Sequence, residues 1–297
     1  MKILLTGARG FVGRHIARSL RDRGYRVYGL LREGDEPPPA EGREACDLWC
    51  QLSELRAQTE VDPFRAIVHI ATAYGRDGSL ADVVESNLLL PIRLLDFCRA
   101  IGCKQFISTD TFFGKPQFSY PFLQAYIRSK REFIGWARLA CDADPDLLFS
   151  SLRLEHVYGE GDASSKFLPD LIARLQRGQP EIPLTLGDQT RDFIYVRDVA
   201  QAYACVLDHA AQLPAGITEY EVGTGCAIPL RQFVNTARIV TGSNSLLRFG
   251  ALPHRQGEIM ASVADNSRLI ALGWRPTTSL NEGLRRTAAV GIGGFDQ

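Results

Sequence analysis

The sequence lacks an excess of charge of either sign, since 34 Lys and Arg residues balance 34 Asp and Glu residues. No basic run stands out, and the sequence therefore predicts neither a nucleic-acid partner nor a membrane-surface partner. No apolar stretch reaches the length of about 20 residues that a membrane-spanning helix needs. The chain begins with an expected strand rather than a signal peptide, and we expect a cytoplasmic protein.

Patterns for disulfides and metals are also missing. The seven cysteines are odd in number and irregularly spaced, which argues against a disulfide framework. Cys46 and Cys50 have no second pair with which to complete a zinc site, and the five histidines form no cluster with metal-ligand spacing. The sequence therefore predicts no metal site.

Strand-like and helix-like segments alternate along the first half of the chain. Short apolar strands are expected at 2–6, 27–31, 65–70, 104–108 and within 146–154, and helices at 11–20, 82–101 and 122–141. This alternation predicts an α/β fold with a right-handed, doubly wound parallel sheet of the Rossmann type. After about Gly159 the pattern becomes irregular, which predicts a smaller C-terminal α/β lobe with some segments returning to the main sheet.

Three glycines directly follow the first expected strand, in the pattern GxxGxxG rather than the more usual GxGxxG. A glycine-rich turn between a strand and a helix lets the backbone approach a pyrophosphate, which then lies at the positive end of the helix. This context makes the motif specific, although a turn that merely needs glycine would look the same. We expect a dinucleotide to be bound by Gly7, Arg9, Gly10, Phe11, Val12 and Gly13.

The end of the second strand bears on which nicotinamide cofactor is used. An acidic residue there would bind the ribose hydroxyls of NAD, but Leu31 occupies that place and Arg32 follows. A leucine cannot bond the ribose, whereas an arginine can hold a 2′-phosphate with paired hydrogen bonds. We therefore predict NADP, held by Arg32 with help from Arg9. The alternative is that Glu33 binds NAD and Arg32 is solvated.

Tyr126 and Lys130 form the most informative pair in the chain. Four residues apart on an expected helix, they lie on one face, one turn from each other. A lysine cation beside a phenol favours the phenolate, and a tyrosine tuned in this way can pass a proton to or from a carbonyl oxygen. Alone, however, this spacing more often marks the surface of a helix.

Hydroxyl residues follow the strand that we expect to end at Ser108. Ligands of parallel α/β sheets bind at the carboxyl ends of the strands. The Thr109 hydroxyl could therefore hydrogen-bond a substrate oxygen. The alternative is a turn in which Ser and Thr side chains bond their own backbone.

Together with these residues, five further segments carry a family resemblance: 71–76 (ATAYGR), 85–93 (ESNLLLPIR), 154–159 (LEHVYG), 189–193 (QTRDF) and 221–225 (EVGTG). From Lys2 to about Leu284 the chain resembles the extended short-chain dehydrogenases/reductases that modify nucleotide sugars, the NAD-dependent epimerase/dehydratase family. The resemblance implies a catalytic set of Thr109, Tyr126 and Lys130, in which Lys130 lowers the tyrosine pKa and binds the nicotinamide ribose. It also adds residues to the expected cofactor site: Asp47 and Leu48 against the adenine, and Ile70, Ala71, Ala73 and Asn87.

The resemblance implies a substrate site as well. Arg191 and Arg255 match family arginines that reach the nucleotide diphosphate, a group that suits paired charge-assisted bonds. A surface ion pair is the alternative for each arginine. His156 stands where the family commonly has asparagine, in a segment that touches the substrate, which suggests a specialised pocket. The alternative is a satisfied core histidine.

Thr109-Asp110-Thr111 occupies the place of the Thr-Asp-Glu motif of sugar-nucleotide 4,6-dehydratases. Without the glutamate, the base that would abstract a proton during elimination is missing. We therefore do not expect dehydration, and we expect Asp110 and Thr111 to contact the substrate. The alternative for Asp110 is that it is a relic of the motif.

The expected function is the NADPH-dependent reduction of a nucleoside-diphosphate 4-keto-deoxysugar in deoxysugar biosynthesis, with CDP-4-keto-3,6-dideoxyglucose as the expected substrate. A net reductase of this family exchanges its cofactor and usually draws on NADPH, so Arg32 favours reduction. The first alternative is a nucleotide-sugar epimerase that retains NAD. The second is a non-catalytic redox sensor that binds NADP, although such proteins usually lose the tyrosine or the lysine.

The resemblance also implies an organisation for the chain. We expect residues 1–160 to form an NADP-binding Rossmann domain that carries the catalytic residues. Residues 161–297 are expected to form mainly the substrate-binding lobe. The helix expected at 82–101 is apolar nearly all round, so it can pack on the sheet and also against a partner. The resemblance implies a homodimer, because the family pairs its two active-face helices into a four-helix bundle, and this apolar helix fits that use.

Overall fold

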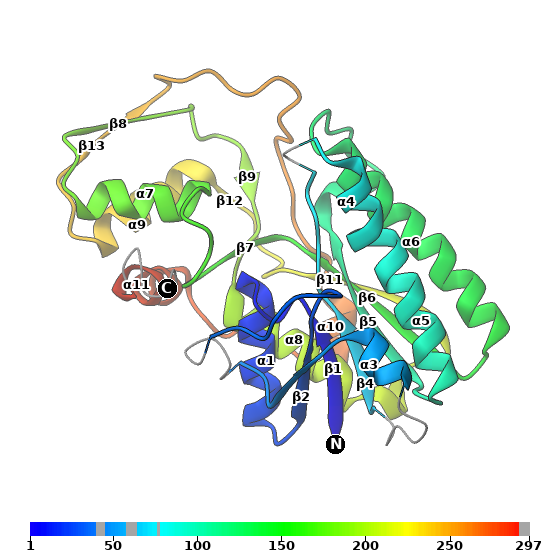
Figure 1. The fold of residues 1–297 in the computed structure, drawn as a ribbon. Coiled ribbons are helices and arrows are strands. Elements are labelled where there is room, and N and C mark those ends of the chain that lie inside the picture. Colours follow the sequence, from blue (N-terminus) through cyan, green and yellow to red (C-terminus); the bar gives the residue numbers. More distant parts are fainter. Residues whose placement is uncertain (40–44, 58–63, 76–77, 291–297) are drawn as a thin grey trace.

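The computed structural model describes residues 1–39, 45–57, 64–75 and 78–290. Its centre is a seven-stranded parallel sheet with the strand order β11-β6-β5-β4-β1-β2-β3 (Figure 1). The strands are β1 (Lys2–Thr6), β2 (Arg26–Leu30), β3 (Leu48–Cys50), β4 (Ala66–His69), β5 (Gln105–Thr111), β6 (Leu148–Leu154) and β11 (Gly216–Val222). The chain starts at β1 and winds outward in both directions, which confirms the predicted doubly wound α/β fold.

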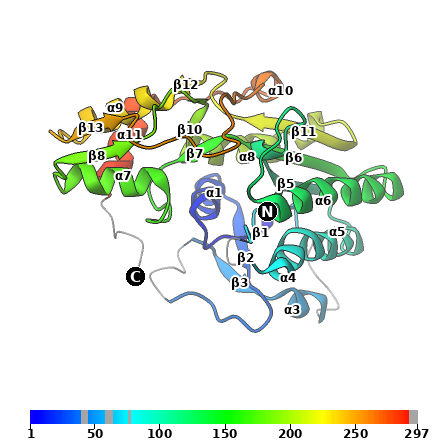
Figure 2. The ribbon, with the colours of Figure 1, turned by 90° about the horizontal axis from the view of Figure 1, so that it is seen from above.

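Helices cover both faces of this sheet (Figures 1 and 2). One face carries α3 (Leu52–Ala57), α4 (Leu80–Val84), α5 (Leu90–Ala100) and α6 (Gln124–Ala143). The other face carries α1 (Phe11–Asp22), α8 (Val196–Asp208) and α10 (Ser267–Ala271). A π-helical turn, η1 (Glu85–Leu89), joins α4 to α5.

The core is divided by the sheet, because side chains alternate between the two faces of a strand. On β1, Ile3 and Leu5 belong to the cluster under α1 and α8, whereas Leu4 belongs to the cluster under α5 and α6. Phe106 and Phe133 lie in this second cluster and are almost fully buried. Burial on both faces explains why the central strands are apolar throughout rather than alternating.

A second lobe lies beyond the carboxyl ends of the strands (Figure 1) and has its own apolar cluster. Three two-stranded sheets form it: β7 (His156–Tyr158) with β10 (Phe193–Tyr195), β8 (Glu181–Leu184) with β13 (Leu246–Phe249), and β9 (Thr190–Arg191) with β12 (Ile228–Pro229). Its helices are α7 (Phe167–Gln176), α9 (Leu230–Val240) and α11 (Leu280–Ala289). Two short 3₁₀ turns follow β5 and α8: η2 (Phe112–Gly114) and η3 (Ala210–Gln212). Between these segments the chain returns to the main sheet with α8 and β11. Within the described ranges, no helix combines the length and the apolar character needed to cross a membrane.

Candidate active site

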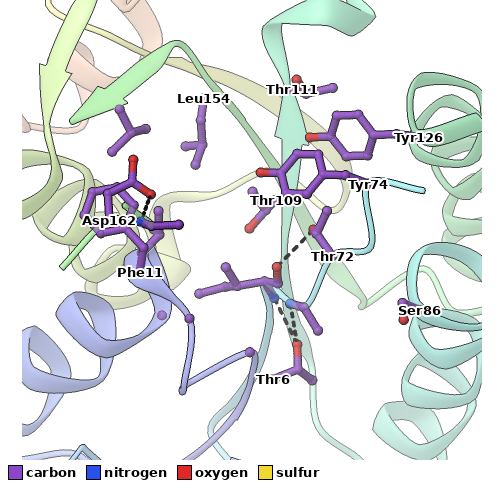
Figure 3. Close-up of a pocket in the computed structure, with 18 of the residues that line it drawn as sticks. Thr6, Phe11, Thr72, Tyr74, Ser86, Thr109, Thr111, Tyr126, Leu154 and Asp162 are labelled. Atoms are coloured by element: carbon purple, nitrogen blue, oxygen red, sulfur yellow. Dashed lines mark hydrogen bonds between the residues drawn. The ribbon is translucent and has the colours of Figure 1, made fainter. Parts of the chain in front are cut away.

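A cleft of about 1610 Å³ lies where the carboxyl ends of the central strands face the second lobe. Its lining comes from the loop between β1 and α1, from the ends of β4, β5 and β6, and from the lobe (Figure 3). A pocket for one small molecule typically measures roughly 300–1,000 Å³. The cleft is therefore large enough for a dinucleotide and a second ligand together.

The glycine loop is built for close approach of the backbone. Gly7 adopts a φ of 67°, and a Cβ on it would lie 2.8 Å from the amide nitrogen of Ala71. A Cβ on Gly13 would lie 2.0 Å from the carbonyl oxygen of Gly7, so no larger residue fits there. Helix α1 has Gly10 at its N-cap, without a side-chain cap and without an acidic residue in its first turn. Its N-terminal N–H groups are thus available to a phosphate, and the site fits a dinucleotide.

The loop after β4 is held rigidly against this glycine loop. The hydroxyl oxygen of Thr6 accepts hydrogen bonds from the amides of Ile70 and Ala71, both at 3.0 Å, as Figure 3 shows. Asn87 is fully buried in the π-helical turn, where its side chain bonds both the amide and the carbonyl of Ala73. Ile70 and Ala71 line the cleft, but Ala73 and Asn87 do not. Asn87 thus braces this loop, and its expected role in binding the cofactor stays a prediction.

The adenine end of the cleft differs from the expectation. The carboxylate of Asp47 accepts a hydrogen bond from the amide of Val27 at 2.7 Å, and the Leu48 side chain is 45% exposed outside the cleft. Trp49 and Leu52 line the cleft instead. The reason is the pairing of β3 with β2, which turns the side chains of this strand in a way that the local sequence does not show.

Charged residues surround this end of the cleft. Arg9, Arg32 and Glu33 all line it. The guanidinium of Arg9 lies 5.9 Å from the centre of the Trp49 ring. The Glu33 carboxylate accepts hydrogen bonds from the amide and the hydroxyl of Ser53, at 3.0 and 2.5 Å. Glu33 is thus engaged with the start of α3.

Tyr126 and Lys130 both lie on the buried side of α6, rather than on its surface. The Lys130 ammonium donates a hydrogen bond to the carbonyl oxygen of Thr109 at 3.0 Å. Burial lowers the pKa of Lys130 to about 8. Burial also raises the pKa of Tyr126 well above its usual value, and the neighbouring Tyr74 adds to this rise. The phenol is therefore a neutral acid at physiological pH.

Strand β5 is longer than expected. It continues through Thr111, because Thr109, Asp110 and Thr111 all pair with residues of β6. The Thr109 hydroxyl lies 2.6 Å from the Tyr203 hydroxyl and donates to the carbonyl oxygen of His69. All three residues, 109 to 111, line the cleft.

A buried ion network supports the ends of β5, β6 and β11. The Lys115 ammonium lies 2.6 Å from the Glu155 carboxylate and 2.9 Å from that of Glu221. Arg153 contacts Asp110 at 2.9 Å and also pairs with Glu221. Buried charges need such partners. Asp110 is thus held by Arg153, which restrains it from acting as a free base.

The substrate end brings together some of the expected residues. Arg255 and His156 line the cleft, and the His156 ring lies 4.3 Å from that of Phe112. Burial lowers the pKa of His156, whose Nδ1 is 3.8 Å from the Glu155 carboxylate, too far for a hydrogen bond. Arg191 does not line the cleft. It is buried in an ion pair with Glu258, and its expected contact with the diphosphate stays a prediction.

Sequence reasoning missed several residues of this site. Tyr74 lies against Tyr126 with ring centres 4.9 Å apart. It belongs to the segment 71–76, which carries the family resemblance but assigns Tyr74 no role. Trp49 follows the expected Asp47-Leu48 pair directly and could have been considered with it. Tyr203 and Lys115 carried no local signal, because their partners lie 94 and 40 residues away in the chain.

A model of the NAD-dependent epimerase/dehydratase family matches residues 3–223, and the chain belongs to this family. It is thus an NAD(P)-dependent enzyme of the extended short-chain dehydrogenase/reductase type, which confirms the family resemblance of the sequence.

Two relatives extend over nearly the whole chain. The chain is 38% identical to the CDP-abequose synthase of Salmonella muenchen over 288 residues, which cover 96% of both chains. It is 36% identical to the CDP-abequose synthase of Salmonella typhimurium over 291 residues, or 95% of both chains. The sequence segments predict a likeness to CDP-paratose synthase, and CDP-abequose synthase is an extended short-chain dehydrogenase/reductase relative of that enzyme.

Solved structures show the same fold. A UDP-glucose 4-epimerase from Stenotrophomonas maltophila, with bound NAD and formylated UDP-arabinopyranose, matches with a TM-score of 0.83 at 21% identity, covering 97% of both chains. The UDP-glucose 4-epimerase of Thermotoga maritima matches with a TM-score of 0.80 at 22% identity, covering 97% of this chain and 98% of that one. These likenesses confirm the Rossmann-type architecture.

Proposed function

We propose that the protein is an NADPH-dependent 4-ketoreductase of a nucleoside-diphosphate 4-keto-deoxysugar, with CDP-4-keto-3,6-dideoxyglucose as its substrate. The observation that carries this proposal is the Tyr126 phenol, which lines the cleft one helical turn from the buried Lys130. A reductase must deliver a proton to a carbonyl oxygen, and a neutral phenol is the form that can do so. The two CDP-abequose synthase relatives support a CDP-sugar substrate and a place in deoxysugar biosynthesis.

The residues of α6 divide the chemistry between them. NADPH, when bound, supplies a hydride to the carbonyl carbon of the sugar. Tyr126 gives its proton to the carbonyl oxygen, and the phenolate left behind regains a proton from water. One hydride and one proton thus convert the ketone to an alcohol. Lys130 lies one turn away, where its ammonium can stabilise that phenolate and bind a ribose hydroxyl.

The charges at the adenine end favour NADPH over NADH. Glu33, the residue that would bind the ribose hydroxyls of NAD, is already engaged by Ser53. Arg32 and Arg9 line the same part of the cleft and can hold a 2′-phosphate. Trp49 offers a flat surface for the adenine beside them.

At the substrate end of the cleft, Arg255 supplies a cation and His156 supplies an aromatic ring. Arg255 lines the cleft and can bind the diphosphate with charge-assisted hydrogen bonds. His156 is partly buried against the Phe112 ring, and we assign it a contact with the sugar rather than a proton-transfer role. Asp110, held by Arg153, shapes the wall near the carbonyl.

The experiment combines the purified protein with CDP-4-keto-3,6-dideoxyglucose and either NADPH or NADH, and follows nicotinamide absorbance. We expect oxidation of NADPH at a higher kcat/KM than that of NADH. Tyr126→Phe should bind NADPH as the unaltered protein does and should lose turnover. The absence of oxidation with every 4-ketosugar nucleotide tried would contradict the proposal. Protein purified with stoichiometric NAD would instead indicate an epimerase, and binding of NADP without any turnover would indicate a sensor.

We also infer a homodimer in which the two copies pack through the sheet face that carries α4, α5 and α6. Val84 on α4 and Trp136 and Leu139 on α6 are large apolar residues that are 50%, 50% and 61% exposed. Exposed apolar residues that form a patch mark sites of protein–protein contact. Sedimentation velocity should show a dimer, and Leu139→Glu should shift it toward monomer.

A further inference from the structure

The substrate end of the cleft carries aromatic rings that take no part in the proposed chemistry. Phe112 and Phe113 form the turn η2 directly after β5, and this turn packs against α6, the helix of Tyr126. The Phe113 ring stacks on that of Tyr120, with ring centres 4.7 Å apart and planes 25° apart. Phe113 and Tyr120, which we call the aromatic platform, are both partly exposed and line the cleft. They offer a flat apolar surface to a ligand.

Further rings hold the aromatic platform in place. The buried Phe112 ring lies 4.0 Å from that of Phe113 and 4.3 Å from that of His156, measured between ring centres. His156 in turn contacts Phe193 edge to face, with ring centres 5.8 Å apart. The orientation of the platform is therefore set by packing inside the protein, before any ligand binds.

The carboxylates at this end of the cleft are already bonded inside the protein. Asp110 on β5 accepts a hydrogen bond from Arg153 at 2.9 Å, and its side chain is 7% exposed. The Glu155 carboxylate, directly after β6, is fully buried and is bonded by Lys115 and by the Ser262 hydroxyl. Acceptor oxygens used in this way have less capacity to bind the hydroxyls of a sugar. The rings of the platform are thus more accessible to a ligand than these two carboxylates are.

The proposed substrate suits such a surface. In a 4-keto-3,6-dideoxyhexose, carbon 3 is a methylene group, carbon 4 is the carbonyl and carbon 6 is a methyl group. The edge of the sugar from carbon 3 to carbon 6 therefore carries no hydroxyl. Burial of such an edge against an aromatic ring is favourable, whereas a hydroxyl buried there without a partner costs free energy.

We propose that the aromatic platform binds the hydroxyl-free edge of the hexose and so selects a 3,6-dideoxy sugar over its 3-hydroxylated counterpart. This inference rests on the proposed ketoreductase function and adds to it the residues that set sugar specificity. Phe113 and Tyr120 are specificity-determining residues, because they pack against the sugar without transferring a hydride or a proton.

The test measures kcat/KM with CDP-4-keto-3,6-dideoxyglucose and with CDP-4-keto-6-deoxyglucose, which differs only by a hydroxyl on carbon 3. An apolar pocket typically disfavours an added hydroxyl by about 100-fold, and we expect a preference of that order in the unaltered protein. Phe113→Ala and Tyr120→Ala should each lower kcat/KM for the dideoxy sugar by about 10-fold or more and should weaken the preference. Tyr120→Phe is the matched control, because it keeps the ring and should keep the preference.

NADPH affinity separates a local effect from damage to the fold. It should be unchanged in all three variants, because the platform lies at the substrate end of the cleft. Should Phe113→Ala not fold, Tyr120→Ala and Tyr120→Phe decide the question alone.

A second measurement needs no turnover. Calorimetric titration with the two alcohols, CDP-3,6-dideoxyglucose and CDP-6-deoxyglucose, should show tighter binding of the first. Its heat-capacity change should also be the more negative, since burial of apolar surface has that signature. Both differences should shrink in Tyr120→Ala and persist in Tyr120→Phe.

The outcomes separate this inference from the proposed function. If the unaltered protein reduces neither ketosugar, the proposed function fails, and the titration still decides whether the platform prefers a dideoxy sugar. If the protein reduces both sugars with equal kcat/KM, or if both alanine variants keep the preference, the inference is overturned. Loss of the preference in Tyr120→Phe would assign it to the Tyr120 hydroxyl and would also overturn the inference. Binding of neither alcohol would contradict both proposals.

Discussion

The cofactor half and the substrate half of the cleft are built in different ways. In the cofactor half, the loops after β1 and β4 are shaped by backbone contacts, such as those of Gly7 and Gly13 and the bonds that Thr6 makes to two amides. In the substrate half, side chains from distant segments hold one another, as Lys115 and Glu155 do across 40 residues. The comparison suggests that cofactor binding depends mainly on local sequence, whereas the substrate site can be altered by changing single side chains.

The largest effect should come from filling the glycine loop. Gly13→Ala places a Cβ 2.0 Å from the Gly7 carbonyl oxygen, so the loop must move away from the helix end. We expect loss of NADPH binding in a fluorescence titration. The matched control is Gly135→Ala on α6, where a Cβ would meet nothing within 4 Å; it should bind NADPH normally and gain up to about 1 kcal/mol of stability. Normal binding by Gly13→Ala would remove the distinction between the two halves.

The next effect tests the ion network of the substrate half. Lys115→Met leaves the buried Glu155 carboxylate without its cation, which typically costs about 3–5 kcal/mol in the free energy of unfolding. Lys104→Met is the control, because Lys104 is 48% exposed in its pair with Asp144 and should contribute less than about 1 kcal/mol. Urea unfolding measures both variants. Equal losses would show that the network is no more important than a surface pair.

Replacing Lys130 should change the stability of the fold by a smaller amount and in the opposite direction, so that the variant is more stable. Burial lowers its pKa from 10.5 in the unfolded chain to about 8, so the folded state binds fewer protons between these values. Stability should therefore rise with pH across this window and carry the full penalty of the buried charge below it. Lys130→Met should be more stable than the unaltered protein by roughly 1–3 kcal/mol at pH 7, although it should lose turnover.

The pH dependence provides the check on this prediction. In thermal unfolding without cofactor, the advantage of Lys130→Met should shrink as the pH rises from 8 toward 10.5. An advantage that stays constant with pH would show that Lys130 is not the titrating group. A variant less stable than the unaltered protein at every pH would show that the bond to the Thr109 carbonyl outweighs the burial of the charge.

The fold and the glycine loop could be predicted because their signals are local. A strand followed by a glycine-rich turn and a helix is found in few structures other than dinucleotide-binding folds. Tyr126 and Lys130 share a face through helical spacing alone. The predicted end of β5 was wrong, because pairing with β6 carries the strand through Thr111. The adenine contacts expected of Asp47 and Leu48 stay predictions, and the structure adds Trp49, which lines the cleft.

By itself, the sequence determined the alternation of strands and helices, the glycine turn and the facing of Tyr126 and Lys130, since each depends on residues within a few positions of one another. Only the tertiary structure decided which carboxylates hold Lys115 and Arg153. These contacts join strands and helices far apart in the chain, and their geometry depends on strand register and packing, which no local pattern records.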